Sequence, residues 1–142
     1  MLFRSRPSTT NYQTLPSGAS NYGITNKKLF NLVTERKSQF LAVNQLDEQT
    51  IVPSEMLFAS GSGLDPHISP KAALLQVDRI VKYRQLDSKE KQQLLQSISG
   101  LTQSPQYLIL GEQRINVLIL IPIRQPIFSQ LIEKRVFSEL DR

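Results

Sequence analysis

Residues 59–79 of this chain, ASGSGLDPHISPKAALLQVDR, join a loop rich in glycine and proline directly to an apolar helical pattern. Gly61 and Gly63 allow the positive φ angles that residues with side chains disfavour. Pro66 fixes its own φ and directs the preceding residue, Asp65, toward an extended conformation. These residues together predict a loop of one defined shape that ends where a helix begins.

Apolar spacing and capping residues predict a mainly helical chain. Ser69 followed by Pro70 is typical of a helix N-cap with proline at the first helical position. Asp87, with Glu90 three residues later, has the spacing of a capping box. The helices that these signals and the apolar stripes predict cover residues 26–43, 70–84, 88–99 and 128–140.

Two short apolar runs predict β-structure. Residues 107–110 and 115–121, separated by the turn 111–114, have the pattern of a hairpin or of two neighbouring strands. In the second run both alternating phases are mostly apolar, which predicts a strand covered on both faces. Residues 53–55 favour a short helical turn, and residues 56–58 a buried anchor. The expected fold class is a small α+β domain, mainly helical, with a short β-sheet or hairpin.

Composition restricts the class of protein. The 142 residues are enough for one domain with a real core. The chain contains no cysteine, which excludes disulfides, thiol catalysis and thiolate metal sites. The longest apolar stretch, residues 115–123, is shorter than the roughly 18 to 20 residues of a membrane-spanning helix. No signal peptide begins at Met1, so the chain read by itself is expected to be soluble.

The net charge of +5 is compatible with several partners. A basic patch suits nucleic acid, anionic lipid or a nucleotide, but the same charge also serves solubility alone. The lysines and arginines are scattered, and neither an arginine-rich run nor an RNA-binding aromatic motif is present. We therefore expect no nucleic-acid partner.

The loop holds the chain's only histidine, His67, two residues after Asp65. A metal site needs more ligands than this pair, so no metal is expected. An acid–base pair is one interpretation. We favour another, in which Asp65 caps the turn through an Asx bond and His67 bonds to the loop backbone. Neither a G-x-S-x-G elbow nor a P-loop occurs, and we predict no catalytic residue.

Backbone N–H groups of the glycine loop and of the helix start at Pro70 have the chemistry to bind an anion such as phosphate. A loop that docks on a protein partner is the alternative, and we favour it. The candidate nucleotide- or partner-binding residues are Ser60, Gly61, Ser62, Gly63, Leu64, Asp65, His67 and Ser69.

Residues 52–80, VPSEMLFASGSGLDPHISPKAALLQVDRI, resemble the central signature of the C subunit of the Kdp potassium-transporting P-type ATPase. The segments FRSRPS (3–8), SGASNYGITN (17–26) and LGEQRINVL (110–118) agree in order and spacing. The resemblance covers roughly residues 3–120. It divides the chain into an extended polar segment (1–26), a soluble domain like that of the Kdp C subunit (27–121) and a divergent, helical extension (122–142).

This resemblance implies a non-catalytic accessory subunit of a high-affinity, ATP-driven potassium uptake pump in the bacterial inner membrane. The implied partners are a potassium-translocating subunit, an ATP-hydrolysing subunit and a small stabilising peptide. The implied roles are assembly of the pump and, as a catalytic chaperone, a higher ATP affinity of the hydrolysing subunit. No cofactor is expected to bind tightly. ATP is a candidate ligand of residues 60–64, a segment that is likened to an ABC-transporter signature.

The family places its soluble domain on the periplasmic face, after an N-terminal membrane helix. Only two residues precede Phe3, so we expect this chain as given to lack that helix. Residues 119–142 do not match the family pattern. Two rivals remain: a free-standing basic module that binds nucleotide or nucleic acid, and a small hydrolase that uses Asp65, His67 and a nearby serine.

Overall fold

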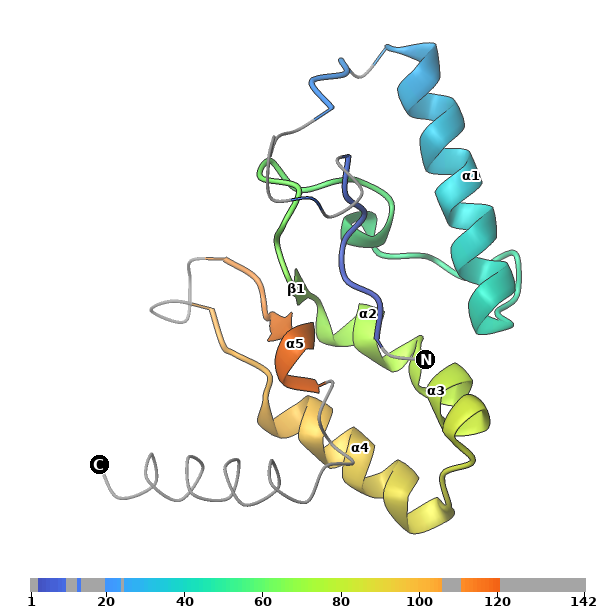
Figure 1. The fold of residues 1–142 in the computed structure, drawn as a ribbon, viewed down its shortest axis with the longest axis vertical. Coiled ribbons are helices and arrows are strands. Elements are labelled where there is room, and N and C mark those ends of the chain that lie inside the picture. Colours follow the sequence, from blue (N-terminus) through green and yellow to red (C-terminus); the bar gives the residue numbers. More distant parts are fainter. Residues whose placement is uncertain (1–2, 10–12, 14–19, 24, 106–110, 121–142) are drawn as a thin grey trace.

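A computed structural model describes residues 3–9, 13, 20–23, 25–105 and 111–120 (Figure 1). Helices dominate these residues, and a two-stranded antiparallel sheet accompanies them, which confirms the predicted α+β class. No helix within the described ranges is both long and apolar enough to cross a bilayer. The elements in chain order are α1 (Lys27–Asn44), the 3₁₀ helix η1 (Ser54–Met56), β1 (His67–Ile68), α2 (Pro70–Leu74), α3 (Val77–Arg84), α4 (Ser88–Gly100), β2 (Ile115–Asn116) and α5 (Val117–Leu120).

The helices begin where their capping residues allow. At the start of α4 the predicted capping box is present, since Asp87 and Glu90 each accept a hydrogen bond from the other's backbone N–H. The Asn26 side chain accepts from the N–H of Lys28 and caps α1. Helix α4 packs against α2 and α3, while α1 contacts α3 and η1 (Figure 1).

The predicted continuous helix over residues 70–84 is wrong, because it is divided into α2 and α3. The break lies at Leu75 and Gln76, where the N–H of Gln76 bonds to the carbonyl of Ala73, three residues back, at 3.0 Å. Such a bond tightens the turn relative to an α-helix. It accompanies the complete burial of the Gln76 side chain.

The predicted strand over residues 115–121 is wrong for residues 117–120, which form α5. The side-chain oxygen of Asn116 accepts from the N–H of Leu118 at 2.9 Å, and the chain turns into α5. Asparagine favours such local bonds over a strand ladder. Leu118 is 60% exposed, so this run is not covered on both faces.

The sheet joins distant parts of the chain. Strands β1 and β2 are antiparallel, with His67 opposite Asn116 and Ile68 opposite Ile115. The predicted strand 107–110 and the predicted helix 128–140 lie outside the described residues. The sheet therefore holds the loop before β1 against the segment that follows α4.

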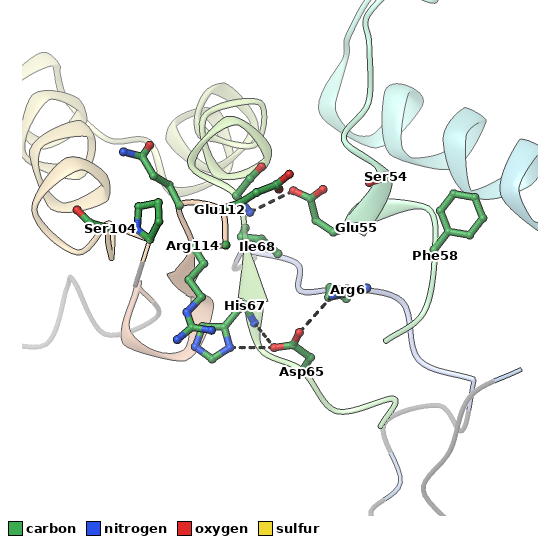
Figure 2. Close-up of a pocket in the computed structure, with 14 residues that line it drawn as sticks. Arg6, Ser54, Glu55, Phe58, Asp65, His67, Ile68, Ser104, Glu112 and Arg114 are labelled. Carbon is green, nitrogen blue, oxygen red and sulfur yellow. Dashed lines mark hydrogen bonds and ion pairs between the residues drawn. The ribbon is translucent and has the colours of Figure 1, made fainter. Parts of the chain in front are cut away.

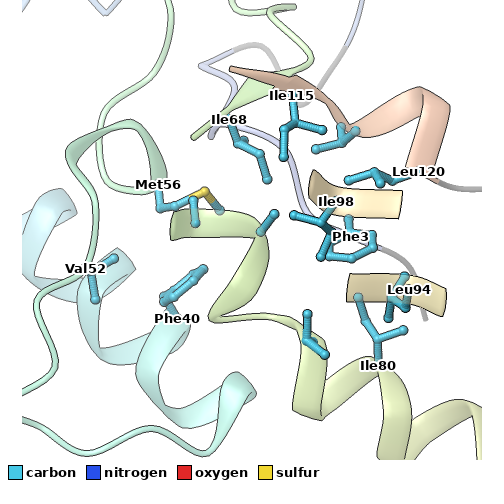
Figure 3. Close-up of a cluster of buried hydrophobic side chains, with 14 of the residues drawn as sticks. Phe3, Phe40, Val52, Met56, Ile68, Ile80, Leu94, Ile98, Ile115 and Leu120 are labelled. Carbon is cyan, nitrogen blue, oxygen red and sulfur yellow. The ribbon is translucent and has the colours of Figure 1, made fainter. Parts of the chain in front are cut away.

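One apolar core lies between the helices and the sheet (Figure 3). Its residues come from every described element and from the N-terminal segment, as expected of a single domain. The buried members are Phe3, Phe40, Leu41, Val52, Met56, Ile68, Ala72, Ala73, Val77, Ile80, Leu94, Ile98, Ile115, Val117 and Leu120.

One expectation about this core is wrong in part, and one core residue was not predicted. Of the predicted anchor at residues 56–58, Met56 is buried and Leu57 partly so, but Phe58 is 40% exposed. The N-terminal segment does reach the core, through Phe3, which is buried. No periodic pattern marks Phe3 as a core residue, because the chain around it is irregular.

A buried amide connects this N-terminal segment to the helices. The Oε1 atom of Gln76 accepts from the N–H of Arg4 at 2.7 Å and from Nη2 of Arg79 at 3.0 Å. Its Nε2 donates to the carbonyls of Arg4 and Ala72, both at 3.2 Å. Arg79 also donates from Nε to Asn44 at the end of α1. All the hydrogen-bonding capacity of the Gln76 amide is thereby used.

We predict that Gln76→Leu lowers the free energy of unfolding by about 3 kcal/mol, because buried main-chain groups and a guanidinium lose their partner. Urea denaturation of the full chain measures this. Gln92→Leu, at an exposed position of α4, is the matched control and should cost little. Equal costs for the two variants would contradict the structural role of the Gln76 amide.

Candidate functional site

An open pocket of about 770 Å³ lies beside β1 (Figure 2). Its walls come from the N-terminal segment, η1, β1 with its flanking residues, and two stretches, 104–105 and 111–114. Three of the predicted site residues line it: Asp65, His67 and Ser69. The predicted residues 60–64 do not, and they form the adjoining loop.

Asp65 is the centre of the charged groups in the pocket. Its Oδ1 accepts from the N–H of His67 at 3.0 Å, which confirms the predicted Asx bond. Nδ1 of His67 lies 2.8 Å from the same oxygen. Because an ionised carboxylate only accepts, the proton of this bond is on Nδ1. The prediction that His67 bonds to loop backbone is therefore wrong, since its ring bonds to the Asp65 carboxylate.

Arg6 completes the cluster, and sequence reasoning missed it. Its Nη1 lies 3.2 Å from Oδ2 of Asp65. The two residues are 59 positions apart, and no local spacing indicates such a contact. The side chains of Arg6, Asp65 and His67 are 27–31% exposed, so the cluster is partly shielded from water.

The surroundings of Asp65 favour its ionised form. Burial by itself raises the pKa of this carboxyl group. Hydrogen bonds from the His67 backbone and side chain, and the charges of His67 and Arg6, outweigh burial and hold the pKa below its ordinary value of 3.8. Asp65 is thus an anion that its own neighbours neutralise.

The loop before β1 uses its own backbone donors. The N–H of Gly63 donates to the carbonyl of Ser60 at 3.1 Å, and the N–H of Asp65 lies 3.4 Å from Oγ of Ser60. The N–H of Leu64 donates to Oγ of Ser62 at 3.3 Å. Three consecutive N–H groups therefore have partners inside the loop, and an external anion would compete with these bonds.

The two glycines of this loop differ. Gly63 has a φ of 72° and is buried, so glycine's freedom is required there. Gly61 does not have a positive φ, and space is open around the position that its Cβ would occupy. The prediction of a backbone role for both glycines is correct only for Gly63.

Backbone N–H groups at the start of α2 also bond to side chains of the protein itself. Oγ of Ser69 accepts from the N–H of Ala72 at 3.1 Å, as predicted for an N-cap. The N–H of Ser69 donates to Oε1 of Glu55 at 3.1 Å. Glu55, on η1, is a further site residue that sequence reasoning missed, because it precedes Ser69 by 14 positions. A protein carboxylate thus lies where an incoming anion would approach this helix.

The site does not form a recognisable catalytic or metal centre within the described residues. His67 makes no hydrogen bond to a serine hydroxyl there, although Ser54, Ser69 and Ser104 also line the pocket. Nor do the described residues bring three potential His, Cys, Asp or Glu ligands together. Among the described residues, the carboxylates of the site bond to groups of the protein itself.

We predict that Asp65 makes stability depend on pH. Because its folded pKa is below its unfolded value, its contribution is present near neutral pH and is lost as pH falls through and below the ordinary value of 3.8. Asp65→Asn should cost roughly 1 kcal/mol at pH 7 and make the acid loss shallower. Urea denaturation at several pH values measures this, with exposed Glu48→Gln as the control. Parallel pH curves for Asp65→Asn and the wild type would contradict it.

Comparison with known proteins identifies the family of this chain. Residues 1–121 match the family model described as K+-transporting ATPase, c chain. The chain is 46% identical, over 118 residues, to the potassium-transporting ATPase KdpC subunit of Leptospira interrogans, covering 83% of this chain and 58% of the relative. It is 38% identical to the KdpC subunits of Caldanaerobacter subterraneus (82% and 58% covered) and Flavobacterium johnsoniae (82% and 60%).

The chain spans about three-fifths of the length of these curated relatives. The matched region contains every described element, from the N-terminal segment to α5. It also contains all residues of the pocket and of the glycine loop. The agreement in sequence extends over the whole described domain, and the chain belongs to the KdpC family of K+-transporting ATPase c chains.

Proposed function

We propose that this chain is a non-catalytic accessory subunit of an ATP-driven potassium uptake pump. The observation that carries this proposal is the match of residues 1–121 to the family of K+-transporting ATPase c chains. The site is compatible with it, since the described residues around Asp65 and His67 do not assemble a nucleophile and its base.

The proposed partners are the potassium-translocating, ATP-hydrolysing and small stabilising subunits of a Kdp pump. The proposed place of the domain is the periplasmic face of the bacterial inner membrane, as a part of that complex. In this setting its task is to support assembly, and a task of this kind requires a surface of fixed shape.

The loop 60–65 and the adjoining pocket supply such a surface. The hydrogen bonds within the loop and the Arg6–Asp65 ion pair hold it before any partner arrives. A preformed surface loses less conformational entropy on binding. Two apolar side chains of this surface, Phe58 in the pocket and Leu64 in the loop, are each 40% exposed and offer area for a partner to bury.

We propose that any effect on ATP affinity acts through protein contact and not through ATP bound to this loop. The N–H groups of Gly63, Leu64 and Asp65 already donate inside the loop. The Glu55 carboxylate lies at the start of α2 and would repel a phosphate. These features favour the accessory subunit over the rival interpretation as a nucleotide-binding module.

Assembly tests the proposal. We predict that Asp65→Ala and His67→Ala each reduce co-purification with the other pump subunits about tenfold, equivalent to about 1.4 kcal/mol of binding free energy. The measurement is recovery from detergent-solubilised membranes. Asp47→Ala is the matched control, since Asp47 makes the same kind of turn bond, to the N–H of Gln49 at 2.7 Å, at another place. Undiminished recovery of both loop variants would contradict the docking role.

ATP binding has its own test. We predict that Mg²⁺–ATP, added to about 2 mM, causes no saturable change in the amide resonances of residues 61–65 of the isolated chain, because an anion must displace internal hydrogen bonds. Two-dimensional NMR titration measures this, with inorganic phosphate as the reference anion. Saturable shifts confined to these residues would instead identify a nucleotide site.

A further inference from the structure

The first described residues of the chain lie across the domain as an extended segment with three anchors. Phe3 inserts its side chain into the apolar core (Figure 3). The main chain of Arg4 bonds to Gln76, and the side chain of Arg6 bonds to Asp65 in the pocket (Figure 2). Each anchor uses a different kind of interaction, and together they fix the course of residues 3–6.

The middle anchor recognises main chain alone. The N–H and the carbonyl of Arg4 both bond to the side-chain amide of Gln76, at 2.7 and 3.2 Å. These are the two groups that one residue of a strand offers to a neighbouring strand. An amide side chain that takes both therefore replaces a strand partner, as in recognition by strand addition. The identity of the side chain at position 4 does not enter these bonds.

Hydrogen bonds to the helices orient the side chain of Gln76 for its bonds to Arg4. Its Nε2 also donates to Ala72 and its Oε1 also accepts from Arg79, so the amide plane is fixed by the helices. Arg79 in turn donates to Asn44 at the end of α1. Gln76 is fully buried, with no exposed area. The receiving groups thus form a rigid slot and not an adaptable surface.

We propose that Gln76 and the apolar core around Phe3 form a binding slot for an extended peptide with an aromatic residue, and that residues 3–6 occupy it in cis as a strap. Occupancy places Arg6 against Asp65 and so couples the strap to the loop 60–65. The slot itself is independent of the pump. Only one consequence rests on the proposed function: through the loop 60–65, the strap affects the docking of a pump subunit.

The coupling follows from the order of the contacts. Arg6 is two residues beyond the anchored main chain of Arg4, so the bonds to Gln76 limit where its guanidinium lies. Asp65 receives Arg6 on Oδ2, while its own N–H faces Ser60 across the loop. Loss of the strap removes the Arg6 charge from Asp65 and loosens the loop. Gln76 is therefore a positioning residue for a loop with which it shares no hydrogen bond among those described.

Amide hydrogen exchange of the full chain, followed by NMR, tests the slot. In the wild type we expect the Arg4 amide to exchange at least about 100-fold more slowly than an unstructured amide. Gln76→Met keeps the length of the side chain but not its hydrogen bonds. It should abolish the Arg4 protection and lower that of Gly63 and Asp65 several-fold, with α4 amides unchanged. Arg4→Ala is the matched control and should leave every protection factor as it is.

Three results would overturn the proposal. They are an unprotected Arg4 amide in the wild type, full Arg4 protection in a folded Gln76→Met variant, and protection that rises with protein concentration, which would mean a strap from a second copy. If Gln76→Met does not fold, Arg6→Ala tests the coupling. Loop protection should fall while the Arg4 amide stays protected, and unchanged loop protection would overturn the coupling. None of these measurements involves the pump, so they fail or succeed separately from the assembly test.

Discussion

A single buried amide, that of Gln76, is the constraint on which the rest of this domain depends. An unpaired amide in an apolar interior is costly, so all its donors and acceptors need partners at once. The partners of Gln76 are Arg4 in the N-terminal segment, Ala72 in α2 and Arg79 in α3. The N-terminal strap, the α2–α3 junction and the end of α1 consequently have one relative arrangement that satisfies the amide.

The parts of the fold that sequence predicts well are those specified by neighbours along the chain. The capping box of α4 and the Ser69–Pro70 start of α2 involve contacts three residues apart, which a sequence displays directly. The break between α2 and α3 is different. No residue near Gln76 in the sequence favours a break there. Arg4, to which Gln76 bonds at the break, is 72 residues away. Periodicity continues through residues 75–76, so it predicts one helix where tertiary bonding favours two.

The same division holds for the site. The Asx bond from Asp65 to the N–H of His67 spans two residues and is predictable. Arg6 and Glu55 reach the site from 59 and 14 residues away and are not. Asn116 shows a third case, since its capping chemistry is visible in the sequence and forms in the structure, while the apolar residues around it predict a strand. A short apolar run fits a strand and a helix equally well, and here a single polar side chain decides between them.

The charges of the pocket bear on the proposed choice between a protein partner and a nucleotide. The Asp65 carboxylate bonds to Arg6 and His67, and the Glu55 carboxylate accepts from the backbone N–H of Ser69, so both acids already have partners inside the protein. An ionic ligand would have to break such a pair before gaining a contact, and would gain little net free energy. A partner that binds apolar surface breaks no such pair, because Phe58 and Leu64 are already exposed. Recognition by shape and apolar contact, with the paired charges as a rigid frame, is therefore the mode that we propose for this site, and it suits the proposed protein partner better than a nucleotide.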